Sequence, residues 1–302
     1  MRIPFYSTLD PTHPRIWPDY KLIVPICAVG NIGQLACDLI ISTLLDRQEC
    51  QLTGRIYSPA LMPVVGPNAF SSQLGPPTTS TEVYESKKHK LVILQQRTSY
   101  FRELKHIYIQ DLIHWIKESK FDQVIVLTSS FAQCNPDLSQ LGNLNVEPIC
   151  AITTSSFEEL KQTDQWKCLN LRQLPQKGNR LKLVSQDGLT YLPGSGLTKA
   201  LIEACEKSFI PAAFIVDFCS EGINLHDCYQ VVDVVGRYIG LNSLDAKIDK
   251  QTWLAQQSAT NAADAGDGST AATTVMSNDF ASTFQGRKNN WVEPYSWAQA
   301  NC

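Results

Sequence analysis

Two glycine-containing turns are the places where this chain could hold a phosphate group. Gly30 and Gly33 follow the apolar run 22–27, and Gly194 and Gly196 stand before another helix-forming stretch. The amino end of a helix offers free N–H groups to an anion. However, the first turn lacks the third glycine of the dinucleotide fingerprint, and neither turn ends in the Gly-Lys-Ser/Thr of a P-loop. We therefore favour a packing role for these glycines, with a nucleotide-binding or small-molecule enzyme as the alternative.

Side chains that could act as nucleophile, acid or base do not form a recognisable set. Ser195 lacks the Gly-x-Ser-x-Gly context, because Pro193 and Leu197 stand where the glycines belong. We expect it to cap the helix that follows. Asp217 and Glu221 lie near the end of an apolar run, where α/β enzymes place catalytic groups, but such acids are also ordinary helix-dipole partners. The five histidines show no metal-ligand spacing. We predict no catalytic, cofactor or metal site.

Alternating strand-like and helix-like segments must position these residues. Continuous apolar runs, typical of parallel strands covered on both faces, predict strands at 22–27, 91–95, 124–127 and 212–218. Apolar residues at the 3.6-residue period predict helices at 31–46, 101–115, 197–208 and 225–239. Asn31 and Gln34 suit a capping box at the first helix.

This order of elements predicts the fold class. It favours an α/β fold with a mostly parallel sheet sandwiched by helices, in three layers α/β/α. The stretch 130–190 is less regular and is compatible with a hairpin or long loops.

Composition changes near residue 252, so we predict an α/β domain at 1–252 and a linker with an aromatic tail at 253–302. The residues of the predicted linker are mostly Ala, Ser, Thr, Asp and Gly, few of which could serve a core. Trp291, Tyr295 and Trp297 follow it. Aromatic residues at the end of a flexible tail are typical of a docking element.

The bulk composition excludes several classes of partner. The chain has 302 residues, 43% of them hydrophobic, and a net charge of −3. No basic field argues for nucleic acid or an anionic membrane, and no apolar run is long enough to span a bilayer. The 10 cysteines contain no Cys-x-x-Cys pair, and several lie in apolar patterns. Buried reduced thiols favour a cytoplasmic and nuclear location.

Four segments in the same order closely resemble the family of proteasome assembly chaperone 2. They are 29–44, 61–68, 124–130 and 192–199, the last accompanied by Ser-Glu-Gly-Ile-Asn at 220–224. Together they span roughly residues 20 to 240, and a Trp-x-x-Pro-x-Ser-Trp pattern at 291–297 is also similar.

The resemblance implies an α/β sandwich related to nucleoside-phosphorylase-like folds, without phosphorylase chemistry. It implies a heterodimer with proteasome assembly chaperone 1 that binds proteasome α-subunits, promotes α-ring assembly and prevents off-pathway assembly. Some members dock through a terminal hydrophobic-Tyr-X motif, which this chain lacks because Pro294-Tyr295-Ser296 is internal. We expect the partner-binding residues to be Gly30, Asn31, Gly33, Gly194, Gly196, Glu221, Trp291, Tyr295 and Trp297.

Overall fold

A computed structural model describes residues 5–7, 15–71, 75–135, 149–174, 191–222, 224–241, 287–288, 291–294 and 296–297. Its strands are β1 Phe5–Ser7, β2 Lys21–Pro25, β3 Gln51–Ile56, β4 Val65–Gly66, β5 Thr78–Thr79, β6 Thr81–Ser86, β7 Leu91–Gln96, β8 Gln123–Phe131, β9 Ile149–Thr153, β10 Arg172–Gln173, β11 Ala212–Cys219, β12 Arg287–Lys288 and β13 Trp291–Val292. Its α-helices are α1 Ile32–Asp46, α2 Lys105–Ser119, α3 Asp164–Lys167, α4 Thr198–Lys207 and α5 Leu225–Ile239.

One nine-stranded sheet forms the middle layer, in the order β1-β3-β6-β7-β2-β8-β11-β9-β10. Its centre, β7-β2-β8-β11, is parallel, with Leu22 opposite Val92 on one side and Val124 on the other. These four strands are the predicted apolar runs, and they are buried on both faces. The flanks are antiparallel where β6 pairs with β3 and β7, and where β9 pairs with β11. The predicted α/β fold is confirmed, with a mixed sheet whose centre is parallel.

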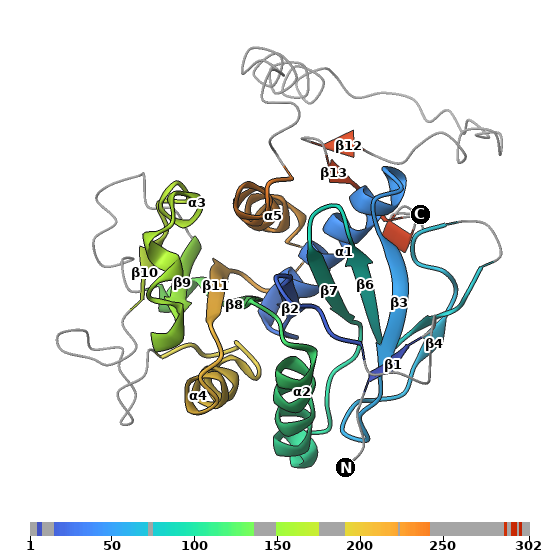
Figure 1. Cartoon of the computed structure of the whole chain (residues 1–302), viewed down its shortest axis with the longest axis horizontal. Coiled ribbons are helices and arrows are strands. Elements are labelled where there is room, and N and C mark those ends of the chain that lie inside the picture. Colours follow the sequence, from blue (N-terminus) through green and yellow to red (C-terminus); the bar gives the residue numbers. More distant parts are fainter. Residues whose placement is uncertain are drawn as a thin grey trace, which may run out of the picture.

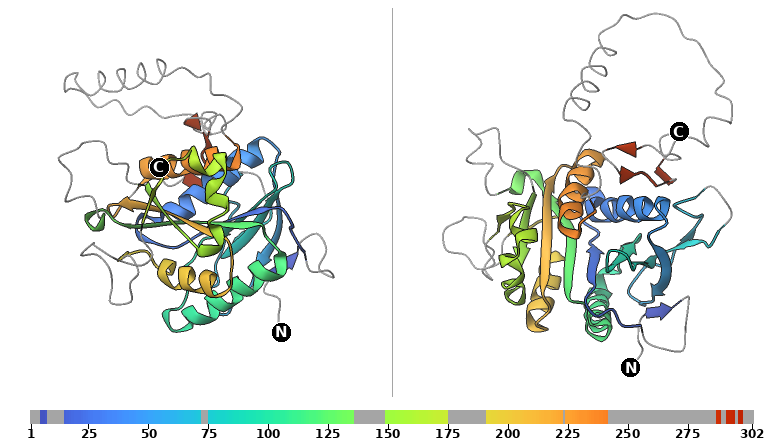
Figure 2. Two further views of the ribbon diagram at one scale, coloured as in Figure 1. Left: turned by 60° about the vertical axis from the view of Figure 1, so that its left-hand side comes forward. Right: turned by 45° about the horizontal axis from the view of Figure 1, so that its top comes forward.

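Helices cover both faces of the sheet (Figures 1 and 2). Helices α1 and α5 pack on one face, and α2 and α4 pack on the other. Most residues of α1 are buried, from Ile32 through Leu44, so its sequence has no wholly polar face. The reason is that α1 is covered twice, by the sheet on one side and by α5 and β13 on the other.

The irregular middle of the sequence contributes to the same sheet. In its described part, β9 joins the sheet beside β11, and β10 runs parallel to β9 at the edge. Short helical turns and α3 connect the two strands. Of the predicted linker and tail, only 287–288, 291–294 and 296–297 are among the described residues, so the boundary at 252 stays a prediction.

Candidate functional site

The carboxyl edge of the parallel strands brings the two glycine turns into backbone contact. The Val29 N–H donates to the Gly194 carbonyl at 2.9 Å. A Cβ placed on Gly196 would lie only 2.3 Å from the carbonyl oxygen of Cys27. The turns, 150 residues or more apart in sequence, therefore form one surface at this edge.

Gly33 permits the close approach of α1 to the sheet. A Cβ at this position would lie 2.4 Å from the Leu127 carbonyl oxygen and 3.1 Å from the Ile26 nitrogen. Both are backbone atoms, one in β8 and one directly after β2, so neither can move aside as a flexible side chain would. This geometry supports the packing interpretation of Gly33.

The predicted capping box at Asn31 is wrong. Gly30 and Asn31 both have left-handed backbones, with φ of 68° and 53°, and the Asn31 side chain caps no helical N–H. A capping side chain reaches the first turn from an extended backbone, which Asn31 does not have. The Asn224 amide closes over this turn instead, 2.2 Å from where a Gly30 Cβ would stand. It donates to the carbonyl oxygen of Ser220 at 2.8 Å.

Ser195 is not the cap of α4 either. Its hydroxyl donates to the Leu192 carbonyl at 2.7 Å and so closes the preceding turn. Helix α4 begins at Thr198, whose hydroxyl donates to the Ser195 carbonyl at 2.6 Å. The same hydroxyl lies 2.6 Å from the Thr128 hydroxyl on β8. Ser195 is therefore a buried structural residue.

The electrostatics of this edge do not suit a phosphate. The three turns 28–34, 192–198 and 219–224 contain no Lys, Arg or His, and Glu221 is their one charged residue. Asp217 lies fully buried on β11. Burial, and to a lesser extent the Asp227 carboxylate, raises the pKa of Asp217 to about 7, and the Phe218 N–H opposes the rise. An anion here would meet acidic groups without a compensating cation in the turns.

The thiols at this edge are not nucleophiles. Burial raises the pKa of both Cys27 and Cys219 to about 11, so both are protonated at neutral pH. The nine described cysteines are all free; Cys37, Cys205 and Cys219 are buried as predicted, whereas Cys27 is half-buried. Among the described residues, no group of three or more His, Cys, Asp or Glu side chains is placed to hold a metal. No helix in this part of the chain has the length and apolarity to cross a membrane.

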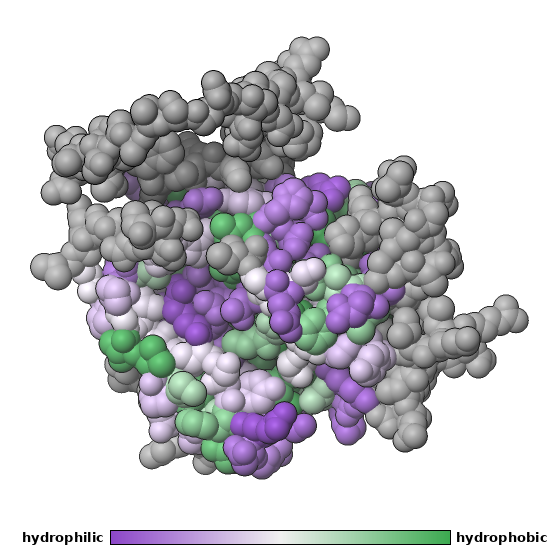
Figure 3. All heavy atoms as spheres, turned by 180° about the vertical axis from the view of Figure 1, so that it is seen from behind, coloured by the Kyte–Doolittle hydropathy of each residue, from purple (hydrophilic) through white to green (hydrophobic). Residues whose placement is uncertain are grey.

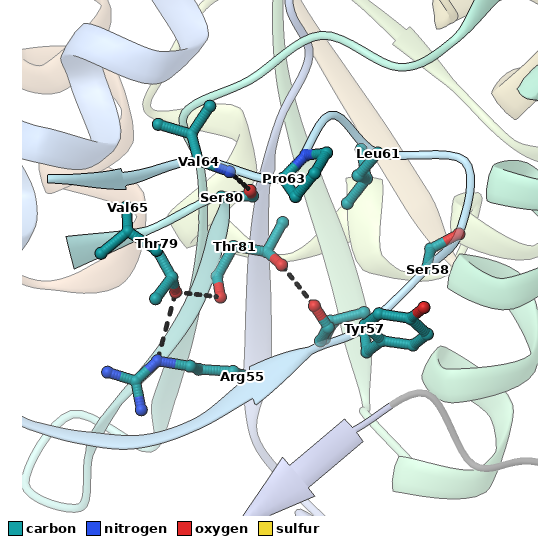
Figure 4. A pocket seen from close by; sticks show the side chains of 11 residues that line it. Arg55, Tyr57, Ser58, Leu61, Pro63, Val64, Val65, Thr79, Ser80 and Thr81 are labelled. Atoms are coloured by element: carbon teal, nitrogen blue, oxygen red, sulfur yellow. Dashed lines mark hydrogen bonds between the residues drawn. The ribbon is translucent and has the colours of Figure 1, made fainter. Parts of the chain in front are cut away.

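Sequence reasoning missed a second feature, an apolar groove beside β3 (Figure 4). The groove has a volume of about 560 Å³ and lies between the end of β3, the loop 57–65 and the β5–β6 segment. Tyr57, Met62 and Val64 are 56%, 46% and 44% exposed, and Val65 is 72% exposed. One signal in the sequence could have indicated the groove. The loop 57–65 is mostly apolar without helical or strand periodicity, and it overlaps the segment 61–68 that resembles the family. Figure 3, the molecule seen from behind the view of Figure 1, shows that apolar residues reach the surface at several separate places.

Polar side chains form the rim of this groove. The Arg55 guanidinium donates to the Thr79 hydroxyl at 3.2 Å, and the Ser80 hydroxyl accepts from the Val64 N–H at 2.9 Å. An apolar centre with a hydrogen-bonded polar rim is the usual anatomy of a protein–protein interface.

The structure gathers six of the nine expected partner-binding residues at the carboxyl edge. Five of these are Gly30, Asn31, Gly33, Gly194 and Gly196, and the sixth, Glu221, is exposed on the adjoining turn. The tail residues are elsewhere: Trp291 is 2% exposed and packs within the α1/α5 core, and Trp297 is half-buried against it. Tyr295 lies outside the described residues.

Comparisons with known proteins place this architecture among proteasome assembly chaperones. A family model described as the PAC2 family matches residues 22–247. Proteasome assembly chaperone 2 of Nematostella vectensis is 34% identical over 230 residues, which cover 75% of this chain and 91% of that relative. Its Homo sapiens counterpart is 32% identical over 224 residues, covering 73% and 81%.

A solved structure agrees on the fold. Pyrococcus furiosus PbaA, described as an archaeal homolog of proteasome-assembly chaperone, aligns with a TM-score of 0.53 at 14% identity, covering 85% of this chain and 94% of PbaA. The matches to the family model and to the two chaperone relatives confirm the family resemblance inferred from sequence segments. The names of the relatives describe chaperones rather than enzymes, in agreement with the prediction that the chain is not an enzyme.

Proposed function

This chain belongs to the PAC2 family, and we propose that it is a chaperone of 20S proteasome assembly that works as one half of a heterodimer with proteasome assembly chaperone 1. The pair would bind proteasome α-subunits, promote α-ring formation and prevent off-pathway assembly, in the cytoplasm and nucleus. The relatives, which align over most of their length, support this proposal by their names.

The observation that carries the proposal is the exposed apolar groove beside β3. Val65, at 72% exposure, is a large apolar side chain on the rim of a preformed hollow. Exposed apolar surface of this kind marks an interaction site, and interfaces between obligate partners are the more apolar ones. We assign the groove to the contact with proteasome assembly chaperone 1.

The carboxyl edge is proposed as a further partner surface. Its exposed members Asn31, Gly194, Gly196 and Glu221 form a rigid, nearly uncharged platform. Rigid backbone suits a scaffold that presents a fixed shape, since little conformational freedom is lost on binding. Of the tail residues proposed for partner binding, Trp291 is enclosed by α1 and α5 in this structure, which leaves Trp297 and Tyr295 as the candidates.

Affinity capture tests the proposal. The full chain, tagged and co-expressed with proteasome assembly chaperone 1, should co-purify with that chaperone in equal amounts and recover proteasome α-subunits from added purified subunits. Expressed alone, it should be poorly soluble, because the groove then faces water. The proposal would be contradicted if no α-subunit were recovered, or if the chain were a soluble monomer that does not bind proteasome assembly chaperone 1.

A further inference from the structure

The end of the chain lies in a groove formed by three separate parts of the fold. We call residues 291–294 and 296–297 the C-terminal strap. Trp291 and Val292 are each 2% exposed, and Figures 1 and 2 show β13 beside α1. The groove is formed by α1, α5 and the loop that carries Ala69. The first two residues of the strap are therefore buried as deeply as the core helices.

Hydrogen bonds fix the strap in one register. The Trp291 indole N–H donates to the Asp233 carboxylate at 2.7 Å. The Val292 N–H donates to the Thr43 hydroxyl at 2.8 Å. The Tyr229 hydroxyl donates to the Glu293 carboxylate. Further along, the Ser296 N–H donates to the Ala69 carbonyl at 3.0 Å. Two of these contacts involve the strap side chains of Trp291 and Glu293, and two hold backbone N–H groups, so together they select those two side chains and fix the direction of the strap.

The groove carries polar groups that match the strap. Thr43 is 1% exposed on the buried side of α1. Asp233 interrupts the valines of α5, one helical turn after Tyr229, so both face the strap. Buried polar groups of this kind destabilise a protein unless they have partners. The helices therefore present a site with donors and acceptors in place, rather than a plain apolar face.

We infer that this groove is a peptide-binding site whose ligand is the chain's own strap, held through its Trp-Val-Glu-Pro sequence rather than through chain connectivity. Residues 240–290 separate the strap from α5. The entropy of closing a loop rises only slowly with its length, so a long connection suffices to keep the ligand near its site. The inference is independent of the proposed function.

Cutting the connection in the folded protein tests the inference. A protease recognition sequence is inserted between Gly266 and Asp267 of the full chain, which is purified with its partner if required and then cut. The piece 267–302 should stay with the remainder through size-exclusion chromatography. Excess synthetic peptide of residues 287–302 should displace it, whereas the same peptide carrying Trp291→Ala should not.

Matched variants show whether a loss of retention comes from the binding site or from unfolding of the remainder. Trp291→Ala should release the piece, and Trp253→Ala, the same change in the predicted linker, should leave it bound. Thr43→Val keeps the shape of the buried side chain but removes the acceptor of the Val292 N–H. It should weaken retention of the piece roughly five- to tenfold, while the melting temperature of the remainder stays close to that of the cut parent.

Three outcomes would overturn the inference. One is release of the parent piece on cutting while the remainder keeps its circular dichroism. Another is equal retention of the Trp291→Ala and parent pieces. The last is an uncut chain that is a dimer only while Trp291 is intact, because the strap would then occupy the groove of a second copy.

Discussion

A buried carboxylate without a side-chain donor is the most unusual single residue of this fold. Asp217 is fully buried on β11, and among the described residues no side chain donates to either of its oxygens. Burial raises its pKa to about 7. Because the carboxyl is protonated more easily in the folded state than in the unfolded chain, it favours folding at low pH and opposes it once ionised.

Stability should therefore fall as pH rises through the interval between 3.8 and about 7, the ordinary and shifted pKa values of Asp217. The full shift corresponds to at most about 4 kcal/mol, and we expect about 1–4 kcal/mol. Asp217→Asn should remove this slope and make the protein more stable than the parent at pH 8. Urea unfolding at pH 5 and pH 8 measures it. Glu221→Gln, an exposed acid nearby, is the control, and an unchanged slope in Asp217→Asn would contradict the assignment.

At the scale of elements, the position of α1 depends on one missing side chain. Gly33 lets the first turn of the helix touch the backbone of β8 and of Ile26, the residue that follows β2. Gly33→Ala should lower the free energy of unfolding by about 2–4 kcal/mol, because the added Cβ would have to push α1 away from the sheet. Gly66→Ala, where a Cβ meets nothing within 4 Å, should be nearly neutral. Urea midpoints compare the two, and equal values would show that α1 adjusts freely.

The central elements could be predicted because their cause is local. Strands β2, β7, β8 and β11 are continuous apolar runs, and α2, α4 and α5 show a clear apolar stripe. Repeated strand–helix order then left few topologies to consider. Likewise, the sequence correctly predicted a packing role for Gly33. A side chain at this position would collide with the backbone of β8.

The antiparallel flank could not be predicted, because its stability comes from distant partners. Strand β6, Thr-Glu-Val-Tyr-Glu-Ser, is buried throughout although four of its six residues are neither aliphatic nor aromatic. Glu85 is buried because Arg15 and the Trp17 indole donate to it, the latter at 3.1 Å. Glu82 forms an ion pair with Arg55 on β3, at 3.9 Å. Such pairings link residues far apart in sequence, so the local sequence pattern does not predict that these carboxylates are buried.

The same limit applies to the strap. An aromatic cluster after a low-complexity stretch favoured docking, but its receptor is formed by Thr43, Asp233 and Ala69, which meet only in the folded chain. The capping predictions at Asn31 and Ser195 failed for a related reason. Both residues sit in turns whose backbone is set by the contact between the two glycine loops rather than by the helix that follows.

At the scale of the whole molecule, three surfaces differ in how much apolar area they leave exposed to a partner. The strap covers the α1/α5 face, and the exposed residues of the carboxyl edge, Asn31, Gly194, Gly196 and Glu221, include no large apolar side chain. The groove beside β3 keeps large apolar side chains in water, with Val65 at 72% exposure. An assembly partner gains most where apolar surface is exposed and preformed, since no ordering of the groove is then needed. We therefore propose the loop 57–65 as the strongest partner contact.

Val65→Asp tests that placement directly. A carboxylate at the centre of an apolar contact would be desolvated without a partner, so we expect co-purification with proteasome assembly chaperone 1 to fall at least about tenfold. The variant should fold normally, because an exposed substitution changes stability by about 0.5 kcal/mol or less. Phe209→Asp is the matched control, since Phe209 is 82% exposed between α4 and β11 and its φ of 54° suits Asp better than Phe. If Phe209→Asp abolishes co-purification while Val65→Asp leaves it intact, the partner binds at the amino ends of the strands and the groove beside β3 is not the interface.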